Sequence, residues 1–365
     1  MKIGILTHHY ANNYGALLQA YALSTVLRNL GHQPTIINRI PKKPTEITQQ
    51  PKWKVSISVL FQNYFTKEFK KFRHCYLHPM THLIDDEIKM NTIADMFDAV
   101  IVGSDQVWRM SYNKGLGLNN FLDFVPDHIT KISYAASFGS DEFEEDKETI
   151  NKISYLLARF KAISVREDSG ITLCKNFFNS DAIHVLDPTL LLLPSDYEKL
   201  IENTDDNDRD KFVVRYLLDP TTKKIKITEQ IALNHNSTIK NIYKESELGF
   251  SLINPKFPLS KFYYPSVTSW ISGIKKAEFV VTDSFHGVTF SILFNKQFLC
   301  IANEDRGLSR MTSLLKKFEL MDRLIIDTNK EQDFKKLPSI DYHRVNEILK
   351  KERQKSLDFL EQNLT

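Results

Sequence analysis

Short apolar runs alternate with helical periodicity along the first half of the chain. Residues 3–6 form a short apolar run, and apolar positions between Leu17 and Leu30 then recur near helical spacing until Gly31. Residues 146–160 have the pattern of a helix, and further apolar runs predict strands at 35–38, 97–103, 132–136, 162–165 and 183–186. Short strands that alternate with helices indicate a mostly parallel α/β sheet.

A second series of the same kind follows a polar, acidic stretch at residues 205–210. Residues 212–218 and 279–282 are apolar and predict strands, and residues 287–294 predict the helix after the second of them. Because the acidic stretch is unsuited to a core, we place the boundary between the two halves near residues 190–210.

This pattern predicts two domains and a terminal helix. The first α/β domain is expected over residues 1–195, with an irregular insertion at about 40–95, and the second over residues 210–335. Residues 341–364 carry apolar positions at amphipathic helical spacing. We expect that last helix to pack across both domains.

Composition places the chain among soluble globular proteins. It has 365 residues, of which 42% are hydrophobic and 25% charged. Lys and Arg exceed Asp and Glu by only three, 48 against 45, so the charge balance does not indicate a nucleic-acid partner. The three cysteines are widely spaced, and the first apolar run ends at the polar His8. We therefore expect a reducing compartment, no signal peptide and a cytoplasmic location.

Common cofactor and metal motifs are absent or incomplete. The Gly115–Gly117 segment begins like a dinucleotide fingerprint but lacks its third glycine and does not directly follow a strand. His74, His78 and His82 have the spacing of one helical face, yet Pro79 would interrupt the helix that such a metal site needs. We expect neither a cofactor nor a bound metal.

Polar turns follow several of the predicted strands, where open α/β sheets bind their ligands. Ser284, His286 and Gly287 come between a strand and a helix, and free N–H groups at a helix start favour an anion. Arg166 follows another strand, where its guanidinium suits a carboxylate or phosphate. Polar and aromatic residues of the other turns suit sugar hydroxyls and sugar faces; they are Asn13, Tyr14, Ser104, Asp105, Gln106 and Trp108.

Five short blocks in these turns occur in the order found in one enzyme family. They are Asn-Tyr-Gly-Ala at 13–16, Gly-Ser-Asp-Gln-Val-Trp at 103–108, Ser-Val-Arg-Glu at 164–167, Leu-Asp-Pro-Thr at 186–189 and Thr-Asp-Ser-Phe-His-Gly at 282–287. Through them the sequence resembles the polysaccharide pyruvyl transferase family. The resemblance implies two Rossmann-like domains that face each other across a cleft, as in GT-B glycosyltransferases. It also implies phosphoenolpyruvate as donor, a saccharide hydroxyl pair as acceptor, and a pyruvate ketal and phosphate as products.

The resemblance also suggests roles for individual residues. In the family, the Arg and His of two of these blocks are associated with the donor site, and here they are Arg166 and His286. The second domain would then be the donor side and the first the acceptor side. Asp105 and Asp187 are candidates for acceptor orientation or base catalysis, because ketal formation needs a general acid and a base. Additional positive charge near the cleft is expected from Arg306 and Arg310.

Two alternatives stay open at this point. The same two-domain fold could serve a glycosyltransferase that uses a nucleotide sugar, or a non-catalytic saccharide-binding protein. The acceptor is also open: derivatives of Gal, Man, GlcNAc or ManNAc, free or lipid-linked, all fit. A lipid-linked acceptor would bring the protein to the inner face of the membrane, with the basic stretch at residues 67–73 as a peripheral contact.

Overall fold

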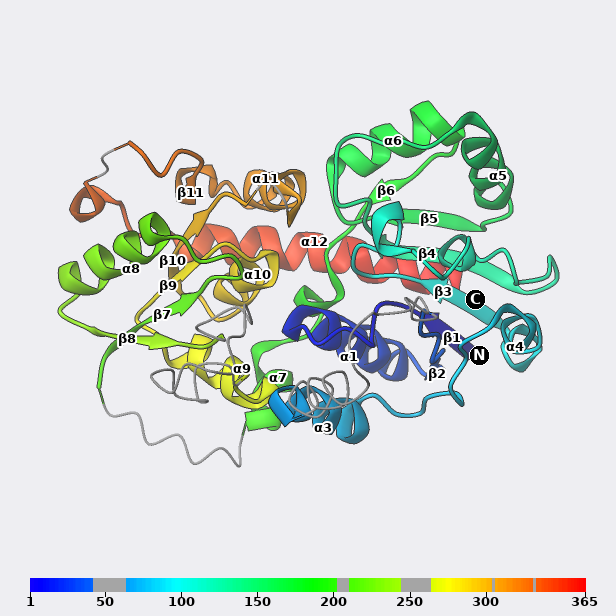
Figure 1. Ribbon diagram of the computed structural model, residues 1–365, viewed down its shortest axis with the longest axis horizontal. Helices are drawn as coiled ribbons and strands as arrows, with labels where there is room; N and C mark the ends of the chain where they lie inside the picture. The colour runs from blue at the N-terminus through cyan, green and yellow to red at the C-terminus, as the bar shows by residue number, and fades with distance from the viewer. Residues whose placement is uncertain (42–63, 202–209, 244–263, 304–305, 331–332) are drawn as a thin grey trace, which may run out of the picture.

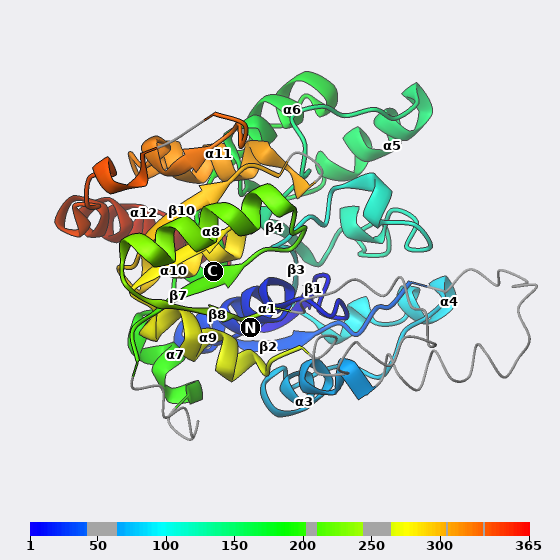
Figure 2. The same ribbon diagram turned by 60° about the vertical axis from the view of Figure 1, so that its left-hand side comes forward.

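The structure is a computed structural model in which two parallel sheets, each with its own helices, lie side by side (Figure 1; Figure 2 shows the same ribbon turned by 60°). It describes residues 1–41, 64–201, 210–243, 264–303, 306–330 and 333–365. The predicted acidic stretch at 205–210 and the insertion at 40–95 therefore lie partly outside the described residues.

The first sheet has six parallel strands in the order β2-β1-β3-β4-β5-β6. Its strands are β1 (Lys2–Leu6), β2 (Gln33–Ile36), β3 (Ala99–Val102), β4 (Thr130–Ala136), β5 (Ala162–Val165) and β6 (Ile183–His184). Its helices are α1 (Tyr14–Asn29), α3 (Lys67–Tyr76), α4 (Glu87–Asn91), α5 (Lys147–Leu157), α6 (Asp168–Phe178) and α7 (Pro194–Ile201). All four residues of β3 are buried, as expected for a strand covered on both faces.

The second sheet has five parallel strands in the order β11-β10-β9-β7-β8. Its strands are β7 (Phe212–Tyr216), β8 (Thr238–Asn241), β9 (Phe279–Thr282), β10 (Gln297–Ile301) and β11 (Leu324–Ile325). Its helices are α8 (Thr222–Asn234), α9 (Val267–Lys276), α10 (Phe285–Leu293) and α11 (Leu308–Lys317). Short 3-10 turns lie at Ala94–Met96, Met110–Tyr112, Asn119–Phe121, Pro188–Leu190, Met321–Arg323 and Phe334–Lys336.

The fold class and its strand pattern are confirmed, with small differences at element ends. The chain passes from the first sheet to the second between β6 and β7, and α7 lies in that crossing. Helix α10 begins at Phe285, two residues before the predicted start, because Ser284 already has the extended backbone of an N-cap residue. In the insertion, α3 ends at Tyr76, before Pro79, so His74, His78 and His82 do not share one helix.

The last helix, α12 (Tyr342–Asn363), crosses both halves and confirms the expected brace (Figure 1). On the second half, Glu352 forms an ion pair with Lys317 of α11 at 2.8 Å. On the first half, the Ser356 hydroxyl accepts a hydrogen bond from the Leu186 N–H at 2.9 Å. Within the part of the chain that the structure describes, none of the helices combines the length and apolar character needed to cross a membrane.

One continuous apolar core joins the two halves. Tyr14 at the start of α1 is fully buried, and its ring stacks on Trp270 of α9 with 5.3 Å between ring centroids. The Tyr14 hydroxyl donates to the Pro265 carbonyl oxygen at 2.8 Å. Buried residues of both sheets belong to this single cluster, so helix α1 of the first half is held against the second half.

Candidate active site

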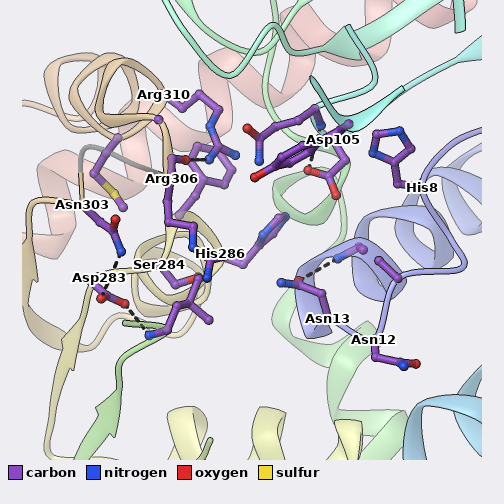
Figure 3. Close-up of a pocket in the computed structure, with 18 of the residues that line it drawn as sticks. His8, Asn12, Asn13, Asp105, Asp283, Ser284, His286, Asn303, Arg306 and Arg310 are labelled. Atoms are coloured by element: carbon purple, nitrogen blue, oxygen red, sulfur yellow. Dashed lines mark hydrogen bonds between the residues drawn. The ribbon is translucent and has the colours of Figure 1, made fainter. Parts of the chain in front are cut away.

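A cavity of about 460 Å³ lies where strand ends of the two sheets meet (Figure 3). Its first-half wall follows β1 and β3, and its second-half wall follows β7, β9 and β10. The polar and aromatic lining comprises His8, Tyr10, Asn12, Asn13, Asp105, Gln106 and Tyr112 on one side and Tyr243, Asp283, Ser284, Phe285, His286, Asn303, Arg306 and Arg310 on the other. This position is where parallel sheets place ligands.

Behind this wall, Arg166 is held between two carboxylates of the first half. Its Nη1 donates to Asp187 Oδ2 at 2.9 Å, and its Nη2 lies 3.4 Å from Asp105 Oδ1. The guanidinium also lies over the Phe285 ring at 4.6 Å. Burial alone would lower the pKa of Arg166, but the two carboxylates raise it, so the guanidinium stays charged.

Asp187 is fully enclosed and has a partner on every side. Its Oδ2 accepts from Arg166 and from the Ser104 hydroxyl at 3.1 Å, while its Oδ1 accepts from the Thr189 hydroxyl at 2.7 Å and the Thr189 N–H at 3.1 Å. His286 Nε2 lies 3.7 Å from the same carboxylate. Burial would raise the pKa of Asp187, yet His286 and Arg166 hold it far below its usual range, so Asp187 is ionised.

Glu167, the neighbour of Arg166, has a different task. Its Oε1 accepts from the Ser137 hydroxyl at 2.9 Å and from the backbone N–H groups of Phe138 and Gly139 at 2.8 and 3.3 Å. Glu167 therefore shapes the loop after β4, and its burial raises its pKa.

Arg310 on α11 contributes a buried positive charge to the cavity. The residue is 6% exposed, its Nε has no hydrogen-bond partner, and its Nη2 donates to the Arg306 carbonyl oxygen. No carboxylate of the described residues lies within ion-pair distance of it. Burial, followed by the repulsion of Arg166, lowers the pKa of Arg310 to about 10, which still leaves it charged at neutral pH. A buried cation of this kind favours an anionic ligand.

The other arginine of this wall, Arg306, is already neutralised. Its Nε and Nη2 donate to the two carboxylate oxygens of Asp219 at 2.8 and 2.9 Å, and this pairing raises the pKa of Arg306. Asn303 donates to Asp283 at 3.2 Å (Figure 3) and also to Asp219 at 2.7 Å. Asp283 in turn accepts from Lys224 at 2.6 Å. These contacts form the edge of the cavity.

The first-half wall carries an ionised carboxylate close to the cationic side. Asp105 has a left-handed backbone with φ of 73°, and its Oδ1 accepts from the Gln106 N–H at 2.8 Å. Burial would raise the pKa of Asp105, but Arg166, His286 and His8 hold it below its usual value. The site thus combines a carboxylate available to hydroxyl groups, Asp105, with a cation available to an anion, Arg310.

A comparison with protein families identifies the chain. A family model described as polysaccharide pyruvyl transferase matches residues 13–305, which include the residues described above at this cavity except His8, Tyr10, Asn12, Arg306 and Arg310. The chain belongs to the polysaccharide pyruvyl transferase family. It is therefore an enzyme that transfers pyruvate to a polysaccharide. A comparison with curated proteins found no match.

Solved structures show the fold of this pyruvyl transferase. UDP-GlcNAc 2-epimerase from Neisseria meningitidis, bound to UDP-GlcNAc, is similar with a TM-score of 0.52 at 8% identity over 100% of this chain and 99% of that one. UGT89C1 of Arabidopsis thaliana has a TM-score of 0.47 at 12% identity over 98% and 95% of the two chains. MnaA of S. aureus with UDP has a TM-score of 0.49 at 11% identity over 96% and 87%. At such identities the epimerase likeness concerns the two-domain fold alone.

Most of the expected site residues of the pyruvyl transferase meet at the cavity, but several lie behind its wall. Asn13, Asp105, Gln106, Ser284, His286, Arg306 and Arg310 line it, whereas Tyr14, Ser104, Trp108, Arg166, Asp187 and Gly287 do not. Asn13 also caps α1 by accepting from the Ala16 N–H at 3.2 Å. The site is therefore built in two layers, with an inner layer that fixes the outer one.

Three expected substrate contacts are corrected by burial. Tyr14 packs into the shared core, as described above. Trp108 is fully buried, stacks on Phe121 and donates its indole N–H to the Asn120 carbonyl oxygen at 2.9 Å. The Ser104 hydroxyl is occupied by Asp187 and by the Ala135 carbonyl oxygen at 3.0 Å.

Gly287 and Arg166 were also expected to contact the substrate, and the structure gives each a different role. A Cβ at Gly287 would lie 2.2 Å from Thr282 Oγ1, so this glycine lets α10 start close to the end of β9. From the sequence we expected Arg166 to bind the donor directly. This expectation is revised, because its two terminal nitrogens already face Asp187 and Asp105.

Sequence reasoning missed His8 and Arg73 as site residues. His8 lines the cavity two residues after β1, and its position at a strand end was the signal for it. Burial lowers the pKa of His8, although Asp105 opposes this. Arg73 of α3 donates to the carbonyl oxygens of Tyr10 and Ala11 at 3.4 and 3.3 Å and to Asn12 Oδ1 at 3.1 Å. No sequence signal links Arg73 to a loop more than 60 residues away.

No metal site stands out. Among the described residues, no group of three or more His, Cys, Asp or Glu side chains could hold an ion. The three cysteines are free thiols, and only Cys75 is exposed.

Proposed function

We propose that this pyruvyl transferase uses phosphoenolpyruvate as donor and two hydroxyls of a saccharide as acceptor, forming a pyruvate ketal and releasing phosphate. The observation that carries the proposal is Arg310, a buried guanidinium that faces the cavity without a carboxylate partner among the described residues. Phosphoenolpyruvate carries a carboxylate and a phosphate, and it would supply the negative charge that this cation lacks.

The donor is assigned to the second-half wall. Helix α10 begins at Phe285 in the cavity wall, so its first N–H groups can donate hydrogen bonds to an anion there. Ser284 adds a hydroxyl at the same point, and Arg310 supplies the charge. Arg166 acts on the donor through the carboxylates that it holds, in place of the direct contact expected from the sequence.

Ketal formation needs one proton at the donor carbon and one at the leaving group. The methylene carbon C3 takes up a proton, one acceptor hydroxyl oxygen bonds to C2, the C2–O bond to phosphate breaks, and the second hydroxyl oxygen then bonds to C2. The two hydroxyl protons balance the equation, since one equivalent ends in the new methyl group and one leaves with phosphate. We assign the proton transfer at the donor to the His286 imidazole, which faces the ionised Asp187 at 3.7 Å.

The acceptor is assigned to the first-half wall. Asp105 is ionised and lines the cavity, so its carboxylate can orient a hydroxyl and take its proton. Gln106, Asn12 and Asn13 offer amides for further hydroxyls. Tyr10 and other tyrosines of the lining offer rings for a sugar face.

Binding of phosphoenolpyruvate tests the donor assignment without knowledge of the acceptor. Isothermal titration with phosphoenolpyruvate should show binding to the wild type, weaker binding to Arg310→Lys and a loss of about 10-fold or more in Arg310→Ala. Arg344→Ala is the matched control, because Arg344 pairs with Glu319 on the surface. Binding of a nucleotide sugar but not of phosphoenolpyruvate would favour the glycosyltransferase alternative and overturn the proposal.

Phosphate release with a panel of saccharide acceptors tests the reaction itself. Wild type and Arg344→Ala should release phosphate from phosphoenolpyruvate and add the mass of a pyruvyl ketal to one acceptor. His286→Ala should release none. Unchanged turnover in His286→Ala would remove that residue from the chemistry.

We further propose that the protein is cytoplasmic and that, if its acceptor is lipid-linked, it contacts the inner face of the membrane peripherally. Arg73 does not add to a membrane surface at residues 67–73, because its guanidinium holds loop 10–12. Co-sedimentation with anionic phospholipid vesicles tests the contact, and equal recovery with neutral vesicles would refute an electrostatic one.

A further inference from the structure

At Gly15, the backbone of helix α1 lies so close to the His286 ring that a side chain at this position would overlap with the ring. Gly15 is the second residue of α1 and is buried. A Cβ at this position would lie 1.9 Å from His286 Nδ1 and 2.4 Å from Cε1 and Cγ. Its three nearest heavy atoms thus all belong to the imidazole, at distances that real Cβ atoms do not adopt.

A second atom of the same ring, Nε2, faces another group of the first half. His286 Nε2 lies 3.7 Å from Asp187 Oδ2, and Asp187 is itself fixed by Arg166 and Thr189. The imidazole belongs to α10 of the second half, yet two first-half groups, Gly15 and Asp187, confine it. Figure 3 shows the ring of His286 directed across the cavity toward the start of α1.

Helix α1 cannot easily retreat to make room for a side chain. Tyr14, the residue before Gly15, stacks on Trp270 and donates to the Pro265 carbonyl oxygen at 2.8 Å. Asn13 caps the same helix end. A Cβ at position 15 would therefore push the imidazole aside before it moved the helix.

We propose that Gly15 is a positioning residue for His286, and that the contact between the two halves keeps the imidazole beside Asp187. The proposal rests on the proposed function, in which His286 moves a proton at the donor. It assigns to the Asn-Tyr-Gly-Ala block of the acceptor side a role in placing a donor-side residue.

Gly15→Ala tests the consequence for the reaction. Phosphate release from phosphoenolpyruvate should fall by about 10²-fold, as expected for a misplacement near 1 Å. The Kd for phosphoenolpyruvate should change little, because Arg310 and the backbone N–H groups at the start of α10 are untouched. The matched control is Gly273→Ala, a buried helical glycine in α9 whose Cβ would lie 2.9 Å from the Ile242 Cγ2 methyl. Gly273→Ala should keep wild-type turnover.

A double-mutant cycle with His286→Ala tests the contact without turnover. Gly15→Ala should lower Tm by a few degrees in the wild-type background, because the ring and the new methyl compete for one place. In the His286→Ala background the same substitution should leave Tm unchanged or raise it, since alanine favours a helix over glycine. This background also provides a folded protein if Gly15→Ala alone does not fold.

The two measurements separate the two proposals. Wild-type turnover in Gly15→Ala, or an equal Tm loss in both backgrounds, overturns the positioning role. If the wild type itself releases no phosphate from phosphoenolpyruvate while the cycle is non-additive, the proposed donor is wrong and the contact between Gly15 and His286 stands.

Discussion

Substitution of Asp187 by asparagine removes one negative charge at the centre of the inner layer and keeps its shape. Asp187 is fully buried and accepts four hydrogen bonds, from Arg166, Ser104 and twice from Thr189. In Asp187→Asn, the amide oxygen can keep the bonds from Thr189, but the amide N–H groups would then point at Arg166, which can only donate.

The cost follows from the Arg166 guanidinium that loses its closest partner. Its other carboxylate, Asp105, lies 3.4 Å away, and the side chain of Arg166 is 1% exposed, so water cannot replace the lost bond. Removing one partner of a buried ion pair costs about 3–5 kcal/mol. For domains of this size such a loss lowers Tm by roughly 10 °C.

Thermal and urea unfolding of wild type and Asp187→Asn measure this loss at pH 7. The matched control is Glu148→Gln, which removes the partner of Lys152 in an exposed ion pair on α5 and should leave Tm unchanged. Equal unfolding midpoints for wild type and Asp187→Asn would refute the view that Arg166 depends on this carboxylate.

The stabilising contribution of Asp187 should depend on pH. The pKa of Asp187 is depressed in the folded state, so its stabilising contribution is present above its unfolded pKa of about 3.9 and is lost as the pH falls further. The difference in unfolding free energy between wild type and Asp187→Asn should be constant from pH 5 to 8. Below about pH 4 the difference should shrink.

Three further predictions concern other parts of the molecule. His184 is partly buried, which lowers its pKa to about 4, so stability should fall as the pH drops from about 6.5 towards 4, and His184→Asn should flatten that decline in a Tm–pH series. Arg73→Ala should raise the KM for the acceptor, with the Kd for phosphoenolpyruvate unchanged in titrations, because it frees loop 10–12 of the acceptor wall alone. Trp108→Phe should lower the unfolding free energy by about 1–3 kcal/mol, because the Asn120 carbonyl oxygen loses its donor, while phosphoenolpyruvate binding persists; weakened binding at unchanged Tm would contradict its placement in the core.

The strands and the place of the site follow from local patterns, which is why they could be predicted. The buried runs of β3 and β9 and the polar turns after them are visible in the sequence, and strand ends of parallel sheets collect ligands. The grouping of Asp105 and His286 at one cavity followed from this rule and from the family resemblance.

The sequence could not show which of these residues line the cavity and which support it from behind, because this depends on contacts between distant segments. Arg166 and Asp187 belong to turns after different strands. Only the distance of 2.9 Å between Arg166 Nη1 and Asp187 Oδ2 shows that the two side chains form an ion pair. Trp108 has the character of a sugar-stacking residue in the sequence, and only its burial shows that it packs in the core. The need for glycine at position 15 arises from a ring 271 residues away, so no local pattern encodes it.

The confinement of the His286 ring by Gly15 and Asp187 has a consequence for chimeric enzymes. If the first half of another pyruvyl transferase were joined to the second half of this one, the acceptor wall would change while the donor wall stayed. We expect such a hybrid to be active only when the donated half brings a glycine and a carboxylate at the two positions that flank the imidazole. Acceptor specificity could then be exchanged together with the first half, provided that the exchanged half keeps the glycine and the carboxylate that contact the imidazole.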